Sequence, residues 1–271
     1  MIRAGDCRSS GSRPWRRSVA DPPPTPLSLP ERLRRLTPAR VQLGRFGTAQ
    51  PTRALLEFSL AHARARDAVH EELASGELLD ALAGQRTIEV HSCAVDRATF
   101  LRRPDLGRSL HANDVEKLVR KGTDLAIVLA DGLSAQAVRK SAAAVALAMI
   151  DDLNGWRIAP LVIARQARVA IGDEIGEALG SSAVVVLIGE RPGLTAPDSL
   201  GAYVTWGPRK GRVDSERNCV SNIRSPQGMS PATAADQIVK LLRAARLEGR
   251  TGLSLKVRAG PDPTRIHPSQ T

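Results

Sequence analysis

Three continuous apolar runs between residues 125 and 188 predict buried strands. They are Leu125–Leu129, Leu161–Ala164 and Val184–Ile188, and stretches with a helical spacing of apolar residues separate them. Strands that are apolar at every position are typical of a parallel sheet that helices cover on both faces. Shorter apolar stretches at 87–90 and 202–206 predict two further strands.

Helices are predicted between these strands and at both ends of the pattern. In the first of them, apolar residues recur at three- and four-residue steps and give the helix one apolar face. The last has Ser230 as its N-cap, Pro231 as its first residue and Gly249 as its C-cap. Asn113 is expected to cap a short helix. The longer predicted helices cover 51–73, 134–153, 172–179 and 230–249.

The order of these elements predicts an α/β fold, with a mainly parallel, Rossmann-like sheet flanked by helices. We divide the 271 residues into a disordered Arg- and Pro-rich tail at 1–30, a mostly helical N-terminal segment at 31–110, an α/β domain at 111–258 and a disordered tail at 259–271. The 42% of hydrophobic residues suffice for one sizeable core. No internal repeat is visible.

The charge and the cysteines narrow the class of protein. With 39 Lys and Arg against 28 Asp and Glu, the formal charge of +11 favours acidic partners, such as phosphate groups or an acidic protein surface. Three cysteines, one of them in the predicted N-terminal tail, give no disulfide framework, so a reducing cytoplasm is expected. Neither a signal peptide nor an apolar run of membrane-spanning length is present.

Polar turns follow two of the predicted strands, which is where open parallel sheets bind ligands. Asp131 and Ser134 follow the first apolar run, and Glu190 follows the third. Two structural explanations compete with a ligand site. Asp131 and Ser134 could cap the next helix, and Glu190 could form an ion pair with Arg191 or another arginine.

The segment 194–228 has little regular pattern apart from the stretch at 202–206, and unpatterned segments of that length in a compact domain are usually functional. Its Ser, Gly, Asn and Arg residues are typical of the wall of a large ligand site. Within it, the pattern alone favours Cys219 as a small buried apolar residue over a reactive thiol. Outside it, Val169 would pass as an ordinary strand residue.

Several common sites are absent from the sequence. There is no G-x-G-x-x-G after a strand, no P-loop, no Cys/His cluster with zinc spacing and no plausible Ser/His/Asp set. The pattern D-x-H-x-x-G, by which some cobalamin proteins supply a histidine to cobalt, is also missing. We therefore predict neither catalytic nor metal-ligating residues in this chain.

Six short motifs in register nevertheless resemble one family, the small subunit of adenosylcobalamin-dependent ethanolamine ammonia-lyase. They occur in the family's order between about residues 40 and 255. They are Gly44–Gly47 leading to Pro51–Leu56, Arg103–Arg108, Asp131–Ser134, Arg168–Val169 with Asp173–Glu177, Gly189–Leu194, and Glu216–Ile223.

The resemblance implies a hetero-oligomer in which a large TIM-barrel subunit binds ethanolamine and carries the catalytic residues. Adenosylcobalamin lies between the two subunits, and its adenosyl radical starts the conversion of ethanolamine to acetaldehyde and ammonia. Family positions that contact the corrin ring fall on Val169, Glu190 and Cys219. The resemblance gives Val169 a packing role, Glu190 the role of accepting amide N–H groups, and Cys219 that of a small, soft contact. The neighbouring Arg168 and Arg191 could bind amide oxygens or the phosphate.

Two departures from the family pattern bear on these expectations. In some members an N-terminal extension relates to packaging inside a bacterial microcompartment, and the Arg- and Pro-rich tail here does not match it. Location in the cytoplasm, inside such a compartment or outside it, therefore stays open. The loop 209–214 is also shorter than the family pattern.

Two other classes of function compete with the cofactor-holding subunit. The charge of +11 would suit a basic nucleic-acid-binding α/β module, but aromatic residues make up only 3% of the chain, so stacking platforms for bases are scarce. A stand-alone α/β enzyme is the third possibility, and turnover without a partner subunit would identify it.

Overall fold

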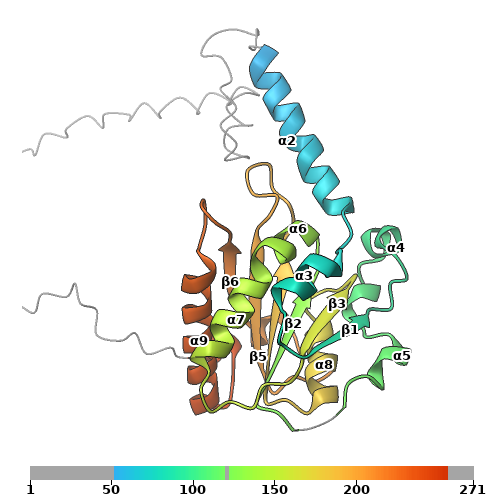
Figure 1. Cartoon of the computed structure of the whole chain (residues 1–271). Coiled ribbons are helices and arrows are strands. Elements are labelled where there is room, and N and C mark those ends of the chain that lie inside the picture. The colour runs from blue at the N-terminus through green and yellow to red at the C-terminus, as the bar shows by residue number, and fades with distance from the viewer. Residues whose placement is uncertain (1–51, 120–121, 256–271) are drawn as a thin grey trace, which may run out of the picture.

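The computed structural model describes residues 52–119 and 122–255. Within these ranges the chain forms a central sheet covered by helices, with one long helix projecting from the body (Figure 1). The two tails predicted at 1–30 and 259–271, and the motif Gly44–Gly47, lie outside the described residues.

The sheet contains six strands in the order β1-β3-β2-β4-β5-β6. The three apolar runs are β2, β3 and β4, and nearly all of their residues are buried. The strands are β1 (Thr87–His91), β2 (Leu125–Ala130), β3 (Leu161–Arg165), β4 (Ala183–Gly189), β5 (Leu200–Trp206) and β6 (Asn218–Ile223).

The α/β class is confirmed, but the sheet is mixed. β1, β3, β2 and β4 pair in parallel, as the apolar runs predicted. β5 and β6 are antiparallel to their neighbours, so the mainly parallel, Rossmann-like description is not confirmed for the sheet as a whole. A parallel strand needs a crossover of a dozen or more residues, and only ten residues join β4 to β5, so the chain turns back.

The helices match the periodic segments of the sequence. The stretch predicted as one helix at 134–153 is continuous but contains a π-helical turn, and the last helix has the predicted Ser230 and Gly249 caps. The helices are α2 (Thr52–His70), α3 (Ser75–Ala81), α4 (Arg97–Arg102), η1 (Leu106–Arg108), α5 (Ala112–Val115), α6 (Ala135–Ala137), η2 (Val138–Ala142), α7 (Ala143–Asp152), α8 (Ile171–Leu179), η3 (Asp214–Glu216), α9 (Pro231–Glu248) and η4 (Gly252–Ser254).

Two local expectations near the N-terminus were wrong. Asn113 lies inside α5, and the ring nitrogen of His111 accepts the hydrogen bond at the helix start instead. The apolar face predicted for the first helix is only partly used, because Leu55 stays exposed while Leu73, which lies just beyond the end of α2, is buried. β1, which precedes the predicted boundary near residue 110, belongs to the same sheet as the later strands.

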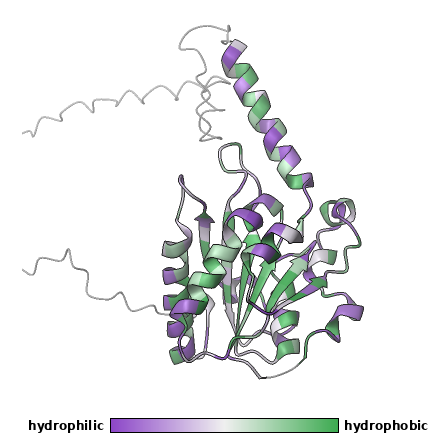
Figure 2. Cartoon of the chain, viewed as in Figure 1, coloured by the Kyte–Doolittle hydropathy of each residue, from purple (hydrophilic) through white to green (hydrophobic). Residues whose placement is uncertain are grey.

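Two apolar layers cover the two faces of the sheet. One packs α6, α7 and α9 against alternate residues of the strands, and α9 covers β5 and β6 from this side. The other packs α8 against β2 and β4. The hydropathy colouring shows mostly hydrophobic strands at the centre and helices that mix hydrophobic and hydrophilic residues (Figure 2). On the second face of β5 and β6, Tyr203 is half-buried and Cys219 and Ser221 are exposed, so this face stays partly open.

None of the helices in the described ranges is long and apolar enough to cross a membrane.

Candidate functional site

The turn after β2 packs tightly against the end of β4. Gly132 has a φ of +55°, and a Cβ at this position would lie 2.2 Å from the carbonyl oxygen of Gly189. Glycine is therefore required here, both for the left-handed backbone and for the close approach. Ser134 caps the following helix by accepting from the Ala137 N–H at 3.2 Å, as the capping alternative predicted.

Asp131 is a buried structural carboxylate. It accepts the backbone N–H groups of Gln166 and Ala167, both at 2.9 Å, and lies 3.4 Å from the Arg97 guanidinium. Burial raises the pKa of Asp131, while these donors act against the rise. The side chain therefore ties the end of β2 to the end of β3, which is neither the predicted capping role nor a ligand contact.

Glu190 is held differently, although it also follows a parallel strand. Its carboxylate accepts the hydroxyl groups of Ser199 and Ser221, each at 2.5 Å, and the backbone N–H of Asn222 at 3.4 Å. Glu190 itself is half-exposed. In the part of the chain that the structure describes, Glu190 forms no ion pair, so the predicted pairing with Arg191 is absent.

Tyr203 and Cys219 lie opposite each other on β5 and β6. Both side chains point to the face that α9 does not cover, and Cys219 is exposed there. Burial raises the pKa of Tyr203 to about 12, and the Cys219 thiol acts in the same direction. Desolvation likewise raises the pKa of Cys219, and the Glu190 carboxylate adds to this effect. Cys219 is therefore a neutral thiol at physiological pH and not an activated nucleophile.

Val169 lines a hollow of about 460 Å³ beside this face, together with Tyr203. A larger hollow of about 790 Å³ lies between α2, α4 and the segment 191–194. Pro104 and Arg168 line both hollows, so the two are adjacent. Charged residues in the lining of the larger hollow are all basic, and Arg168 and Arg191 are exposed there.

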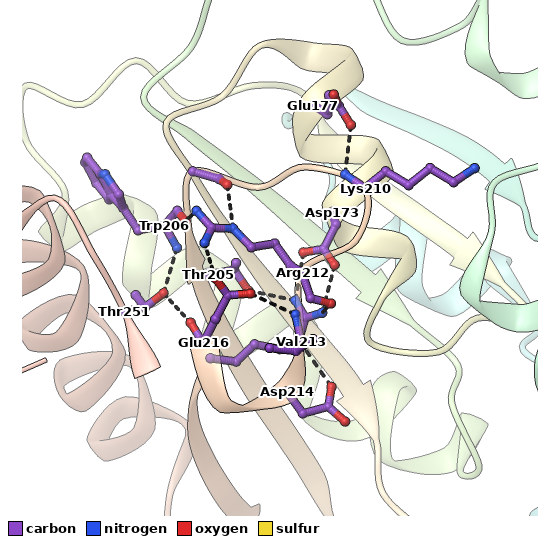
Figure 3. A network of polar contacts seen from close by, with 12 residues as sticks. Asp173, Glu177, Thr205, Trp206, Lys210, Arg212, Val213, Asp214, Glu216 and Thr251 are labelled. Carbon is purple, nitrogen blue, oxygen red and sulfur yellow. Dashed lines mark hydrogen bonds and ion pairs between the residues drawn. The ribbon is translucent and has the colours of Figure 1, made fainter. Parts of the chain in front are cut away.

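A buried ion pair fixes the start of β6 (Figure 3). Both terminal nitrogens of Arg217 donate to Asp173 of α8, at 2.7 and 2.8 Å, and one also donates to Thr205 at 3.1 Å. Arg212 donates to the carbonyl oxygens of Trp206 and Gly207, both at 3.0 Å. The loop before Cys219 is thereby closed onto the sheet, and the position of Cys219 follows from it.

The three predicted contact residues thus gather at one end of the molecule. Glu190 and Cys219 lie on the open face of β5 and β6, and Val169 lines the hollow next to it. Sequence reasoning missed Tyr203, which lies between all three. Its only signal was its position in a short apolar stretch, as the single tyrosine of the chain. In the described ranges, no group of three or more His, Cys, Asp or Glu side chains could hold a metal ion.

Comparison with known proteins decides the family. The family model described as "Ethanolamine ammonia-lyase light chain (EutC)" matches residues 29–256. The chain belongs to the ethanolamine ammonia-lyase light-chain family. Proteins named ethanolamine ammonia-lyase small subunit are similar over most of their length. That of Xanthomonas campestris pv. campestris is 49% identical, covering 89% of this chain and 92% of the relative. That of Bradyrhizobium diazoefficiens is 51% identical, covering 83% of this chain and 88% of the relative.

Membership of the ethanolamine ammonia-lyase light-chain family confirms the predicted function as a lyase subunit in ethanolamine degradation. It favours this function over a nucleic-acid-binding module or a stand-alone enzyme. A small subunit implies a large-subunit partner.

Proposed function

We propose that this light chain holds adenosylcobalamin at its interface with the large subunit, through Val169, Glu190 and Cys219. The observation that carries the proposal is the convergence of these side chains on one open surface. Glu190 and Cys219 share the uncovered face of β5 and β6, and Val169 opens onto the hollow beside Tyr203.

The chemistry of the surface fits the periphery of a corrin, a broad, mostly apolar ring rimmed by amides. Val169 and the Tyr203 ring offer apolar contact, and Cys219 offers a soft, neutral one. The Glu190 carboxylate offers the negative acceptor that an amide N–H prefers. Each of the three positions therefore matches a different part of the same ligand.

The two hollows extend this surface toward the N-terminal helix. Arg168 borders both of them and Arg191 borders the larger, where apolar side chains from α2 and α4 line the wall. Guanidinium groups donate in a planar fork, which suits amide oxygens and phosphate. We assign these two arginines to the amide oxygens or to the phosphate of the cofactor's nucleotide tail.

The role of this chain is positioning. Adenosylcobalamin supplies, when bound, a carbon radical by cleavage of its cobalt–carbon bond. The residues of the light chain bind and orient one side of the cofactor and exclude water there, and none of them is assigned a proton transfer. The catalytic residues that act on ethanolamine are assigned to the large subunit.

Reconstitution tests this proposal. The full-length chain, its large subunit and adenosylcobalamin are combined, and acetaldehyde formation from ethanolamine is followed with each component omitted in turn. Retention of cyanocobalamin by the two-subunit complex on gel filtration gives a readout that is independent of turnover. We expect activity and retention only when both subunits are present.

Matched variants separate the cofactor contact from general damage. Glu190→Gln should weaken retention, whereas Glu248→Gln, at the end of α9 on the other side of the sheet, should not. Retention by the large subunit alone, with unchanged affinity, would overturn the assignment to this chain. Cytoplasmic location, with or without a microcompartment shell, is a further proposal that fractionation of cells checks.

A further inference from the structure

Three donors converge on the Glu190 carboxylate, one from the residue before β5 and two from β6. Ser199, just before β5, donates its hydroxyl to one carboxylate oxygen and accepts the Glu190 backbone N–H at 2.9 Å through its own carbonyl. Ser221 of β6 donates to the other oxygen. Since one serine holds each oxygen, the carboxylate can neither rotate nor swing away without losing a hydrogen bond.

The third donor exists because β6 contains a bulge. The pairing of β5 with β6 shifts by one residue near Leu200 and Ala202, and Asn222 has a φ of +58°. Asparagine is one of the few side chains that tolerates this left-handed backbone. The backbone N–H of Asn222 thereby lies 3.4 Å from the carboxylate instead of pairing regularly with β5. Bulges that redirect a group in this way are frequent next to functional sites.

A glycine leaves the space that the carboxylate occupies. A Cβ at Gly201 would lie 2.9 Å from Glu190 Oε1 and 3.3 Å from a ring carbon of Tyr203. Gly201 has an ordinary extended conformation, so its backbone would accept another residue. The closest contact is therefore the end of Glu190, which would have to move, and the Tyr203 ring would have to give by a few tenths of an ångström.

We propose that Ser199, Ser221, Asn222 and Gly201 form a clamp that sets Glu190 for one more donor, supplied by a peripheral amide of the cofactor. The inference rests on the proposed function. An ionised carboxylate has about four acceptor positions. Three donors occupy the clamp, so one position is left, and the side chain is half-exposed on the open face. The clamp residues are positioning residues, since they act through Glu190.

The clamp also explains why serine hydroxyl groups hold the Glu190 carboxylate, although an arginine would bind it more strongly. An arginine would neutralise the carboxylate and compete for its last acceptor position. Serine hydroxyls fix the geometry and leave the negative charge in place. The ligand group at this point is thus a neutral or positive N–H donor, and an anionic group is disfavoured.

The test measures the affinity of the two-subunit complex for cyanocobalamin by equilibrium dialysis. Removing the Ser221 hydroxyl in Ser221→Ala should weaken binding about fivefold, and Ser221→Thr, which keeps the hydroxyl, should stay within about twofold of wild type. Gly201→Ala should weaken binding about tenfold, because it displaces the carboxylate. Ser182→Ala, an exposed serine before the start of β4, is the matched control and should bind as wild type does.

Melting temperature and co-purification with the large subunit are measured on the same variants, and the clamp requires both to stay unchanged. Equal weakening in Ser221→Ala and Ser221→Thr would show that the hydroxyl is irrelevant and would refute the clamp. Wild-type affinity in Ser221→Ala and Gly201→Ala, with weak binding in Glu190→Gln, would refute it while the proposed function stands. If the wild-type complex does not bind cyanocobalamin, both the clamp and the proposed function are refuted.

Discussion

Two carboxylates follow neighbouring strands of the same sheet, yet their environments differ. Asp131 follows β2 and is buried, and it bonds to two backbone N–H groups and to Arg97. Glu190 follows β4, is half-exposed and bonds mainly to two serine hydroxyls. Their positions relative to the strands are equivalent, so the topology alone does not separate a structural carboxylate from one that we propose as a ligand contact.

The two carboxylates differ in the groups that donate hydrogen bonds to them and in how accessible their oxygens are. The backbone N–H groups at the end of β3 are themselves buried. Without an acceptor they would destabilise the fold, and Asp131 supplies that acceptor. Its oxygens are inaccessible, with 1% of the residue exposed. Glu190 keeps an acceptor position that a ligand can reach. A carboxylate at the end of a strand is therefore a candidate contact when its partners are hydroxyls and part of it stays exposed.

The largest effect expected from this contrast is on stability. Asp131→Ala leaves two buried N–H groups and the Arg97 guanidinium without their acceptor, and we expect the free energy of unfolding to fall by about 3–5 kcal/mol. Glu190→Ala should cost less, about 1–2 kcal/mol, because the exposed Ser221 and Asn222 can bond to water and only the buried Ser199 hydroxyl loses its acceptor. Urea denaturation of both variants measures the difference. Similar losses in the two would mean that Glu190 is structural as well.

The next effect concerns charge at the ligand. Cobalamin derivatives in which one peripheral amide is hydrolysed to a carboxylate should include one that meets Glu190. We expect this acid to bind the wild-type complex about tenfold more weakly than the amide does, because like charges repel at short distance. Glu190→Gln should remove most of that penalty and leave the other acids unaffected. If every acid loses affinity equally in both proteins, no amide is specific to Glu190.

A smaller effect is expected at Cys219, whose thiol pKa is raised by desolvation, which disfavours the reactive thiolate. Cys219→Ser keeps the size of the side chain, so cobalamin affinity should change by no more than about threefold. Cys219→Phe adds a ring on the open face and should weaken binding more. Titration of the two-subunit complex with cyanocobalamin compares the variants, and complete loss in Cys219→Ser would show that the thiol itself is required.

The sequence predicted most of the fold because the parallel strands and long helices are strongly periodic. It missed β6 for a physical reason. The bulge at Asn222 places the inward Val220 and Ile223 three residues apart, so the two-residue alternation that identifies a strand is broken. The reversal of direction after β4 was missed with it, since the antiparallel pairing of β5 and β6 depends on contacts distant in sequence.

For the site, motif resemblance supplied Val169, Glu190 and Cys219, and pattern reasoning alone had left each with a structural alternative. What sequence could not supply is the set of partners. Ser199, Gly201 and Ser221 were recognised only as part of a polar wall, because their convergence on Glu190 requires the strand pairing. Asp131 was expected to cap a helix, and its bonds to the end of β3 equally depend on the parallel pairing.

The smallest expected effect is on the absorbance of Tyr203. Its measurement tests whether this side chain is shielded from water, as a wall between Val169 and Cys219 requires. Tyr203 is the only tyrosine in the chain, so tyrosinate absorbance reports on this residue alone. Burial raises its pKa from 10.0 to about 12. Because the folded pKa exceeds the unfolded one, this side chain contributes stability that is present below pH 10 and is lost as the pH rises toward 12. We expect the absorbance midpoint of the isolated folded chain near 12 and no absorbance change in Tyr203→Phe. A midpoint near 10 in protein that is still folded would mean that water solvates the ring, and a solvated ring would not form the wall between Val169 and Cys219.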